Sequence, residues 1–366
     1  MSLSIGIVGL PNVGKSTLFN ALTRAQKAVA ANYPFSTIES NHAVVPLPDE
    51  RLTRLQEWVG VENAIPARVD FVDVAGLVKG AHKGEGLGNR FLGHIRHVDA
   101  IAHVVRCFDD DNVAHVNERP QPADDIAVIN TELALADLQQ LERLLEKLER
   151  DVKGDRKLQG QLEMARRAQA FVGEGAPLRD FDGRDHTDFA ALEFEMRFLT
   201  SKPLIYVANV DEDGLQRGNS YLDSAKEIAA AEGALLITVC AGLEQELSSL
   251  SDEERAEYLS VYGLAGSSLD ALISESYDLL GLISYFTFNE DETRAWTIRR
   301  GWTAPQAAGV VHTDMERGFI RAEVIPFAVF ERHQDRNAIK AAGLLGVEGR
   351  DYVVQDGDVI LFRFNV

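Results

Sequence analysis

Five apolar runs of strand length interrupt the first 240 residues of the chain. They cover residues 4–8, 69–73, 100–105, 204–208 and 234–239. The runs are nearly continuous rather than alternating, and helix-length segments separate them, which is typical of strands buried on both faces of a parallel sheet. The pattern therefore predicts an α/β domain.

Between residues 129 and 199 the pattern becomes that of helices. Leucines recur in steps of three and four from Leu135 to Leu148, which predicts a helix with a narrow apolar seam. A turn region rich in Gly, Pro and Asp follows, and a second set of apolar residues at helical spacing comes after it. Because strand-like runs resume at Leu204, we expect an antiparallel helical arm that interrupts the α/β domain.

The C-terminal region has the pattern of a small mixed β domain. Its strand candidates are residues 284–288, 294–298, 319–325 and 359–364. Thr303 as N-cap, with Pro305 in the first turn, predicts a short helix. The predicted domains are residues 1–128 with 200–280 for the α/β domain, 129–199 for the arm, and 281–366 for the C-terminal domain.

Composition adds limits on the partners and the location. The chain has 366 residues, of which 45% are hydrophobic and 26% charged, and no apolar run approaches the length of about 20 residues that a membrane span needs. The net charge of −20 argues against a surface built for nucleic acid. We therefore expect neither a membrane nor DNA as a partner. One basic exception lies between Lys147 and Arg167.

The N-terminus and the cysteines indicate the compartment. Strand-like sequence begins almost at once, without the basic and apolar regions of a signal peptide. Cys107 and Cys240 are the only cysteines, and each lies in an apolar run. Two cysteines are too few for a disulfide framework, so we expect a cytoplasmic protein.

The sequence GLPNVGKS, residues 9–16, fits the phosphate-binding pattern G-x-x-x-x-G-K-S/T. It follows an apolar run and precedes a helical one, as phosphate binding at a helix N-terminus requires. Lys15 would reach the β and γ phosphates, and the Ser16 hydroxyl would ligate Mg²⁺. The expected phosphate-binding residues are Asn12, Val13, Gly14, Lys15, Ser16 and Thr17.

A second motif, DVAG, starts at the end of an apolar run. Asp73 would hold Mg²⁺ through water, and the N–H of Gly76 would meet the γ-phosphate. Thr37 is a candidate hydroxyl that senses both Mg²⁺ and the γ-phosphate, although a surface-loop threonine is the alternative. The expected Mg²⁺ ligands are Ser16, Thr37 and Asp73.

Two positions bear on hydrolysis. Leu77 occupies the place where Ras-like proteins carry a glutamine that orients water, so unaided hydrolysis should be slow. His115 could bring an imidazole to the water, and a solvated loop histidine is the equal alternative. Asn12 could help to hold a monovalent cation such as K⁺. The expected catalytic residues are Lys15, Gly76, Leu77 and His115.

NVDE, residues 209–212, follows the fourth apolar run, where a guanine-reading loop would have Asn-Lys-x-Asp. Glu212 moves the carboxylate by one methylene, and Val210 lacks the lysine stem that covers the base. An Asn209 amide could pair with adenine's N6 and N7, which favours ATP. The alternative is that NVDE is an ordinary turn and the base is read elsewhere.

These motifs, together with NYPFSTIESN and RAWTIRRGWTAPQAAGVVHTDMERGFIRAEVI, resemble the YchF subfamily of Obg-related P-loop NTPases, the Obg-like ATPases. The resemblance covers the whole chain. It implies a TRAFAC-type nucleotide domain, an inserted coiled-coil arm and a C-terminal TGS domain of β-grasp fold. It also implies ATP hydrolysis stimulated by K⁺ and binding to ribosomes, for which we expect contact through the arm and the TGS domain.

Three functional hypotheses follow. The first is a ribosome-associated ATPase switch that prefers adenine over guanine. The second is an Obg-type GTPase switch, which base selectivity would separate from the first. The third is a nucleotide-gated binding module with negligible turnover, which Leu77 makes credible.

Overall fold

The computed structural model describes residues 3–30, 41–74, 87–110, 119–264 and 266–365. The chain forms two compact units. Unit 1 contains residues 1–43 and 70–272, and unit 2 contains residues 44–69 and 273–366. Unit 2 is therefore built from two pieces of chain that are far apart in the sequence.

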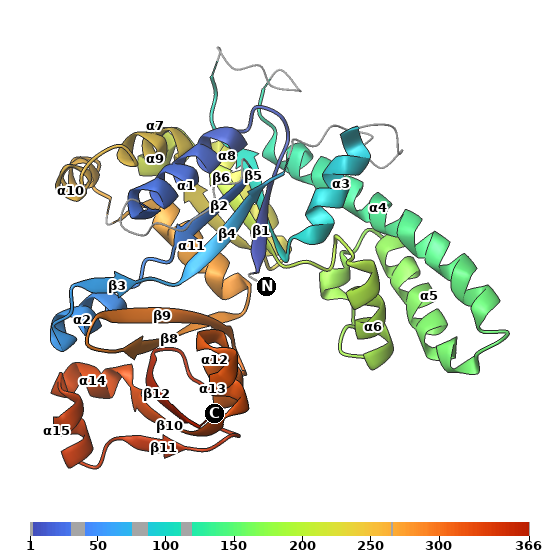
Figure 1. The fold of residues 1–366 in the computed structure, drawn as a ribbon. Coiled ribbons are helices and arrows are strands. Elements are labelled where there is room, and N and C mark those ends of the chain that lie inside the picture. The colour runs from blue at the N-terminus through green and yellow to red at the C-terminus, as the bar shows by residue number, and fades with distance from the viewer. Residues whose placement is uncertain (1–2, 31–40, 75–86, 111–118, 265, 366) are drawn as a thin grey trace. The chain divides into compact units, whose positions relative to one another are not determined.

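A six-stranded sheet contains all five apolar runs that the sequence predicts as strands (Figure 1). Its order is β2 (His42–Pro46), β4 (Arg68–Asp73), β1 (Ser4–Val8), β5 (Ala100–Arg106), β6 (Leu204–Asn209) and β7 (Leu235–Val239). The pairs β4–β1, β1–β5, β5–β6 and β6–β7 are parallel. Every residue of β1, β5 and β6 is buried. The predicted parallel sheet is confirmed, and the three strands β1, β5 and β6 are covered on both faces, whereas β4 and β7 are only partly buried.

Helices connect and cover these strands. Helix α1 (Lys15–Ala30) packs against β1 and α9 (Ala241–Leu247), while α4 (Pro122–Asp151) and α8 (Ser220–Ala231) pack together over β5 and β6. Unit 1 also contains α3 (Leu87–His97), α7 (Glu212–Arg217) and α10 (Asp252–Val261), and α11 (Ser268–Leu279) begins in it. Within the described part of the chain, no helix combines the length and apolar character needed to cross a bilayer.

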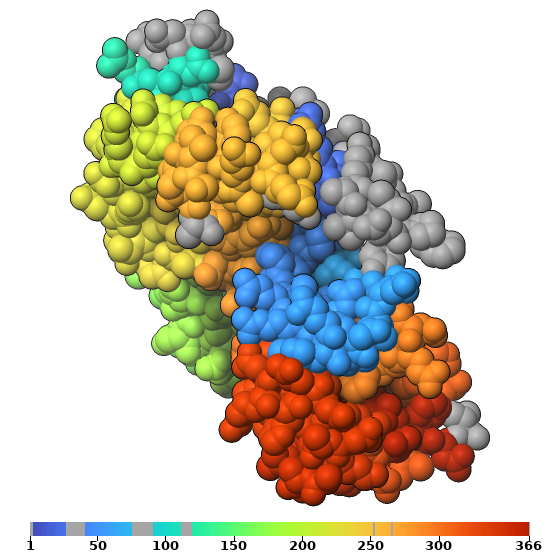
Figure 2. Space-filling model, turned by 90° about the vertical axis from the view of Figure 1, so that its left-hand side faces the viewer, coloured from blue at the N-terminus to red at the C-terminus, as the bar shows by residue number. Residues whose placement is uncertain are grey.

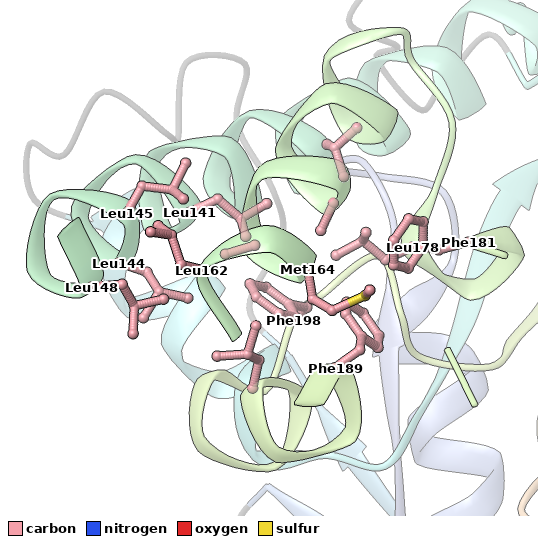
Figure 3. Close-up of a cluster of buried hydrophobic side chains, with 14 residues drawn as sticks. Leu141, Leu144, Leu145, Leu148, Leu162, Met164, Leu178, Phe181, Phe189 and Phe198 are labelled. Atoms are coloured by element: carbon pink, nitrogen blue, oxygen red, sulfur yellow. The ribbon is translucent and has the colours of Figure 1, made fainter. Parts of the chain in front are cut away.

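The helical insert consists of α4 (Pro122–Asp151), α5 (Gln159–Gly173) and α6 (Thr187–Met196). Leucines of α4 and α5 and the phenylalanines Phe181, Phe189 and Phe198 form a separate apolar core between these helices (Figure 3). Leu135 is only partly buried, because the first half of α4 buries Leu133 and Ala136 instead. The insert is helical, as expected, and its classification as a coiled coil stays a prediction.

Unit 2 contains a second six-stranded sheet. Its order is β11 (Gly346–Glu348), β10 (Phe319–Pro326), β12 (Asp358–Phe364), β8 (Leu282–Phe288), β9 (Glu292–Arg299) and β3 (Asn63–Ile65). Helix α12 (Ala304–Val311) begins after Thr303, which forms a capping box with Gln306, and its alanines pack into the core beneath the sheet. Three further helices, α13 (Thr313–Arg317), α14 (Phe327–His333) and α15 (Arg336–Ala341), complete the C-terminal piece.

The segment 44–69 supplies α2 (Glu50–Val59) and β3 to unit 2. β3 pairs in parallel with β9, and Trp58 lies 5.7 Å from the ring of Phe327 and 6.1 Å from that of Phe330. The sequence pattern predicts this segment as part of the nucleotide domain, because nothing near it in the sequence signals its distant partners. Its packing assigns it to unit 2, while the TGS classification stays a prediction.

Candidate nucleotide-binding site

The phosphate loop joins β1 to α1 in a left-handed local geometry. Asn12 has a φ of 61° and Gly14 a φ of 97°, a region that asparagine tolerates and glycine enters freely. A Cβ atom at residue 14 would also collide with the side-chain nitrogen of Asn209. The second glycine of the motif is therefore required both by its backbone angle and by the close approach of β6.

Lys15 is buried at the start of α1, and its Nζ donates to the carbonyl of Leu10 at 2.8 Å. Burial lowers the pKa of Lys15 to about 8, and the nearby carboxylate of Asp73 partly opposes this shift. The ammonium group is thus held inside the loop by a neutral oxygen. A bound phosphate would give this ammonium group an anionic hydrogen-bond partner.

Asp73 ends β4, and burial raises the pKa of its carboxyl while Lys15 lowers it. Ser16, the second residue of α1, is exposed, so its hydroxyl is accessible. Hydroxyl and carboxylate oxygens are the ligands that Mg²⁺ prefers, and a cation near Asp73 would offset the desolvation of its ionised form. Ser16 and Asp73 therefore fit a Mg²⁺ site. Thr37, Gly76, Leu77 and His115 lie outside the described residues.

A pocket of about 530 Å³ lies beside the phosphate loop, within the usual size of a ligand site. It is lined by the loop, by the ends of β5 and β6, and by the start of α9. The lining residues are Asn12, Gly14, Lys15, Ser16, Thr17, Phe108, Asp110, Asn209, Val210, Asp211, Glu212, Cys240, Ala241, Gly242, Leu243 and Glu246. The pocket therefore brings the phosphate loop and NVDE together, although Asn209 comes 193 positions after Ser16 in the sequence.

Asn209 holds the site together. Its Nδ2 donates to the carbonyl of Val13 at 2.9 Å, and its Oδ1 accepts from the N–H of Ala241 at 3.1 Å. The side chain is buried. Both ends of the amide are thus hydrogen-bonded to the protein. Asn209 therefore links the phosphate loop to the β7–α9 connection. The pairing of Asn209 with adenine stays a prediction. It would use the second hydrogen of Nδ2 and the second lone pair of Oδ1.

The rest of NVDE also takes defined positions. The side chain of Val210 is buried, and that of Asp211 caps α7 by accepting from the N–H of Gly214 at 2.8 Å. Glu212 opens α7 at the pocket wall and accepts a hydrogen bond from Tyr262 at 2.9 Å. Of the two carboxylates in the motif, Glu212 is therefore the one not used as a helix cap.

Phe108 is the aromatic residue among the residues that line the pocket. It was not among the site residues predicted from the sequence. Arg106 fixes it from below: its guanidinium lies 4.9 Å from the Phe108 ring centroid and donates to the carbonyls of Phe108 and Asp110 at 3.1 and 3.2 Å. A rigid ring at a pocket wall can stack on a purine. The position of Phe108 directly after β5 could have predicted its place in the pocket, since the carboxyl ends of parallel strands meet at one edge of the sheet.

Residues 240–243 were missed as well, although they follow β7 in the same way. Cys240, Ala241, Gly242 and Leu243 line the pocket, with Cys240 as a buried free thiol. Burial raises the pKa of Cys240, and the charges of Glu212 and Asp211 add to the effect. The thiol therefore stays protonated and acts as part of the wall rather than as a nucleophile.

A parallel sheet that presents this loop, this lysine and a strand-end aspartate at one edge defines a P-loop nucleoside triphosphatase. Comparison with known families agrees. A model described as 50S ribosome-binding GTPase matches residues 4–147, and the model of the C-terminal region of YchF GTPases, described as a protein of unknown function, matches residues 282–365.

Whole-chain relatives identify the family. The chain is 51% identical to the "Ribosome-binding ATPase YchF" of Haemophilus influenzae, over all of both chains. It is 44% identical to human "Obg-like ATPase 1", over all of this chain and 93% of that protein. The solved structure of the Schizosaccharomyces pombe YchF GTPase superposes with a TM-score of 0.89 at 37% identity, covering 99% of this chain and 98% of that one. The chain belongs to the YchF family.

Proposed function

We propose that the chain is a ribosome-associated switch that hydrolyses ATP to ADP and phosphate and prefers adenine to guanine. Relatives that match it over their full length are named ribosome-binding ATPases. The buried free cysteines fit a reducing compartment, and we place the protein in the cytoplasm. The rival readings are an Obg-type GTPase and a nucleotide-gated module with negligible turnover.

The adenine preference rests mainly on one observation, the geometry of the NVDE loop. A guanine-reading loop holds an aspartate at the base edge and a lysine stem over the ring. In this chain Val210 turns into the protein core and Asp211 caps α7. Glu212, one methylene longer than aspartate, starts a helix and is bound by Tyr262. Guanine therefore lacks the bidentate acceptor that would favour it.

The phosphate side of the site supports hydrolysis by positioning and charge. Lys15 would hold the β and γ phosphates, and Ser16 and Asp73 would hold Mg²⁺, which would neutralise the charge that develops on the phosphates. We expect slow unaided turnover because Leu77 cannot orient water, with His115 as the candidate group that does. Asn12 would help to hold K⁺ between the phosphates and so raise the rate.

The test is a pair of calorimetric titrations with non-hydrolysable analogues of ATP and GTP in the presence of Mg²⁺. We expect the ATP analogue to bind at least about tenfold more tightly, which corresponds to about 1.4 kcal/mol. A preference for the GTP analogue would contradict the proposal and favour the Obg-type GTPase. Multiple-turnover assays with and without ribosomes and K⁺ then separate the ATPase from a binding module that hardly turns over.

A further inference from the structure

Two tyrosines of one helix lie against the two glutamates at the rim of the nucleotide pocket. Glu212 and Glu246 both line the pocket. The hydroxyl of Tyr262 donates to Oε2 of Glu212 at 2.9 Å, and the hydroxyl of Tyr258 lies 3.5 Å from Oε2 of Glu246. The tyrosine rings stack with their centroids 5.1 Å apart. The tyrosine pair therefore connects α7 to α9 along the edge of the pocket.

Helix α10 contains Tyr258, and Tyr262 is its C-cap residue. At its start, Ser251 and Glu254 form a capping box. Near its middle, Arg255 pairs with Asp270 of α11 at 3.0 Å. The helix lies on the surface that Figure 2 presents, in the gold to orange range of the colour scale. The Arg255–Asp270 pair, which lies outside the nucleotide pocket, thus ties α10, with Tyr262 at its C-terminal end, to α11.

The hydrogen bond from Tyr262 occupies the Glu212 carboxylate, the group of NVDE that could otherwise accept hydrogen bonds from guanine. A free carboxylate accepts two hydrogen bonds from guanine, one from N1–H and one from the 2-amino group. Adenine has a lone pair at N1, which a carboxylate repels. Glu212 is the remaining carboxylate of the NVDE motif, since Asp211 is committed to capping α7. An interaction that holds Glu212 away from the base edge therefore lowers the affinity for guanine nucleotides without lowering the affinity for adenine nucleotides.

We infer that Tyr262 is a positioning residue that withholds the Glu212 carboxylate from the purine and so selects against guanine. This inference rests on the proposed ATP preference and names a residue that enforces it. The tyrosine remains a donor at neutral pH, because its hydrogen bonds with Tyr258 and then Glu212 raise its pKa. Hydrogen bonds to charged groups are stronger than neutral ones, so the bond favours the conformation in which Glu212 faces Tyr262.

The test compares Tyr262→Phe with the matched control Tyr258→Phe. Both variants keep a stacked aromatic pair and lose one hydroxyl, but only the first frees Glu212. Calorimetric titration with non-hydrolysable ATP and GTP analogues should show that Tyr262→Phe binds the GTP analogue about fivefold or more tightly than the wild type, as expected for loss of one charged hydrogen bond. Affinity for the ATP analogue should change by less than about twofold, and Tyr258→Phe should resemble the wild type.

A second variant shows whether the effect passes through Glu212. Adding Glu212→Gln to Tyr262→Phe replaces one acceptor oxygen by a donor, so the gain in GTP affinity should disappear. An unchanged ATP-to-GTP ratio in Tyr262→Phe would overturn the inference while leaving the ATPase proposal intact, and so would an equal shift in Tyr258→Phe. If the wild type itself does not prefer ATP, the proposed function fails, and the inference fails with it.

Discussion

At the scale of single residues, Lys15 shows how the phosphate loop is prepared for phosphate. Its ammonium group is buried and bonded to one neutral carbonyl, that of Leu10. Burial is the main reason that its pKa falls from 10.5 to about 8, and Asp73 opposes the fall only in part. The loop therefore contains a cation whose charged form is costly until an anion arrives.

This cost predicts proton uptake on nucleotide binding. Phosphates should raise the pKa of Lys15 again, so above pH 8 the bound state holds a proton that the free state has lost. Affinity for an ATP analogue should then fall by up to about tenfold per pH unit above pH 8. Calorimetry in buffers of different ionisation enthalpy measures the proton directly, and adenosine, which lacks phosphates, is the control.

The ligand-free protein should show the opposite trend. Between pH 8 and 10.5 the unfolded chain binds the Lys15 proton and the folded chain does not, so the contribution of this group to the free energy of unfolding rises with pH. For nucleotide binding, an affinity for the ATP analogue that stays constant from about pH 8 to 9.5 would refute the proton uptake by Lys15.

At the scale of elements, the base of the helical insert depends on one buried carboxylate. Asp137 of α4 is fully buried and accepts hydrogen bonds from the N–H groups of Leu199 and Thr200 at 2.9 and 2.8 Å and from the Thr200 hydroxyl at 2.8 Å. Gln140, one turn later, donates to the carbonyl of Met196 at 2.7 Å. These hydrogen bonds join α4, which begins the insert, to residues 196–200, which end it.

We expect Asp137→Asn to loosen this junction. The amide can offer one acceptor atom where the carboxylate offers two, and its NH₂ group would face backbone donors. Hydrogen exchange of the Leu199 and Thr200 amides should accelerate by about tenfold or more, since a buried hydrogen bond is lost. Asp124→Asn, on the exposed side of the same helix, is the control. Equal protection in both variants would show that the carboxylate is dispensable.

The elements that the sequence predicted are those with a long local pattern. Apolar runs gave the strands of unit 1, and Thr303 with Pro305 gave the start of α12. β3 has three residues and begins with Asn63, so it carries no periodicity, and its partner strand is encoded more than 200 residues later. Pairing over such a distance leaves no local signal.

The candidate site divides in the same way. The phosphate loop is one continuous stretch with a known spacing, so its residues could be named in advance. Phe108 and Gly242 each belong to an ordinary stretch and acquire a place in the pocket only when the sheet brings strand ends together. The two hydrogen bonds of Asn209 were invisible for the same reason.

At the scale of the whole molecule, the charge distribution limits where an RNA-rich partner can bind. The chain carries a net charge of −20, yet Lys153, Arg156 and Lys157 are all exposed in the turn between α4 and α5. Their local charge is opposite to that of the chain as a whole. We expect this tip of the insert to contact the phosphates of ribosomal RNA.

The expectation can be tested by charge reversal. Replacing Lys153, Arg156 and Lys157 by glutamate should weaken co-sedimentation with ribosomes at least about tenfold at low salt, because several phosphate contacts are lost together. The control reverses three other exposed basic residues, Arg119, Arg143 and Lys226, with the same change in net charge. If both triple variants lose binding equally, or neither does, the tip is not the contact.

The two-piece construction of unit 2 also has a consequence in time. Asn63 leaves the ribosome 228 residues before Asp291, the residue whose carbonyl it contacts beside β9. At the usual speed of translation this separation lasts roughly 10 to 45 seconds. Through that interval the edge of β3 and the ring of Trp58 have been synthesised, but β9, Phe327 and Phe330 have not. The second unit can therefore only be completed at the very end of synthesis, after most of the first unit has been made.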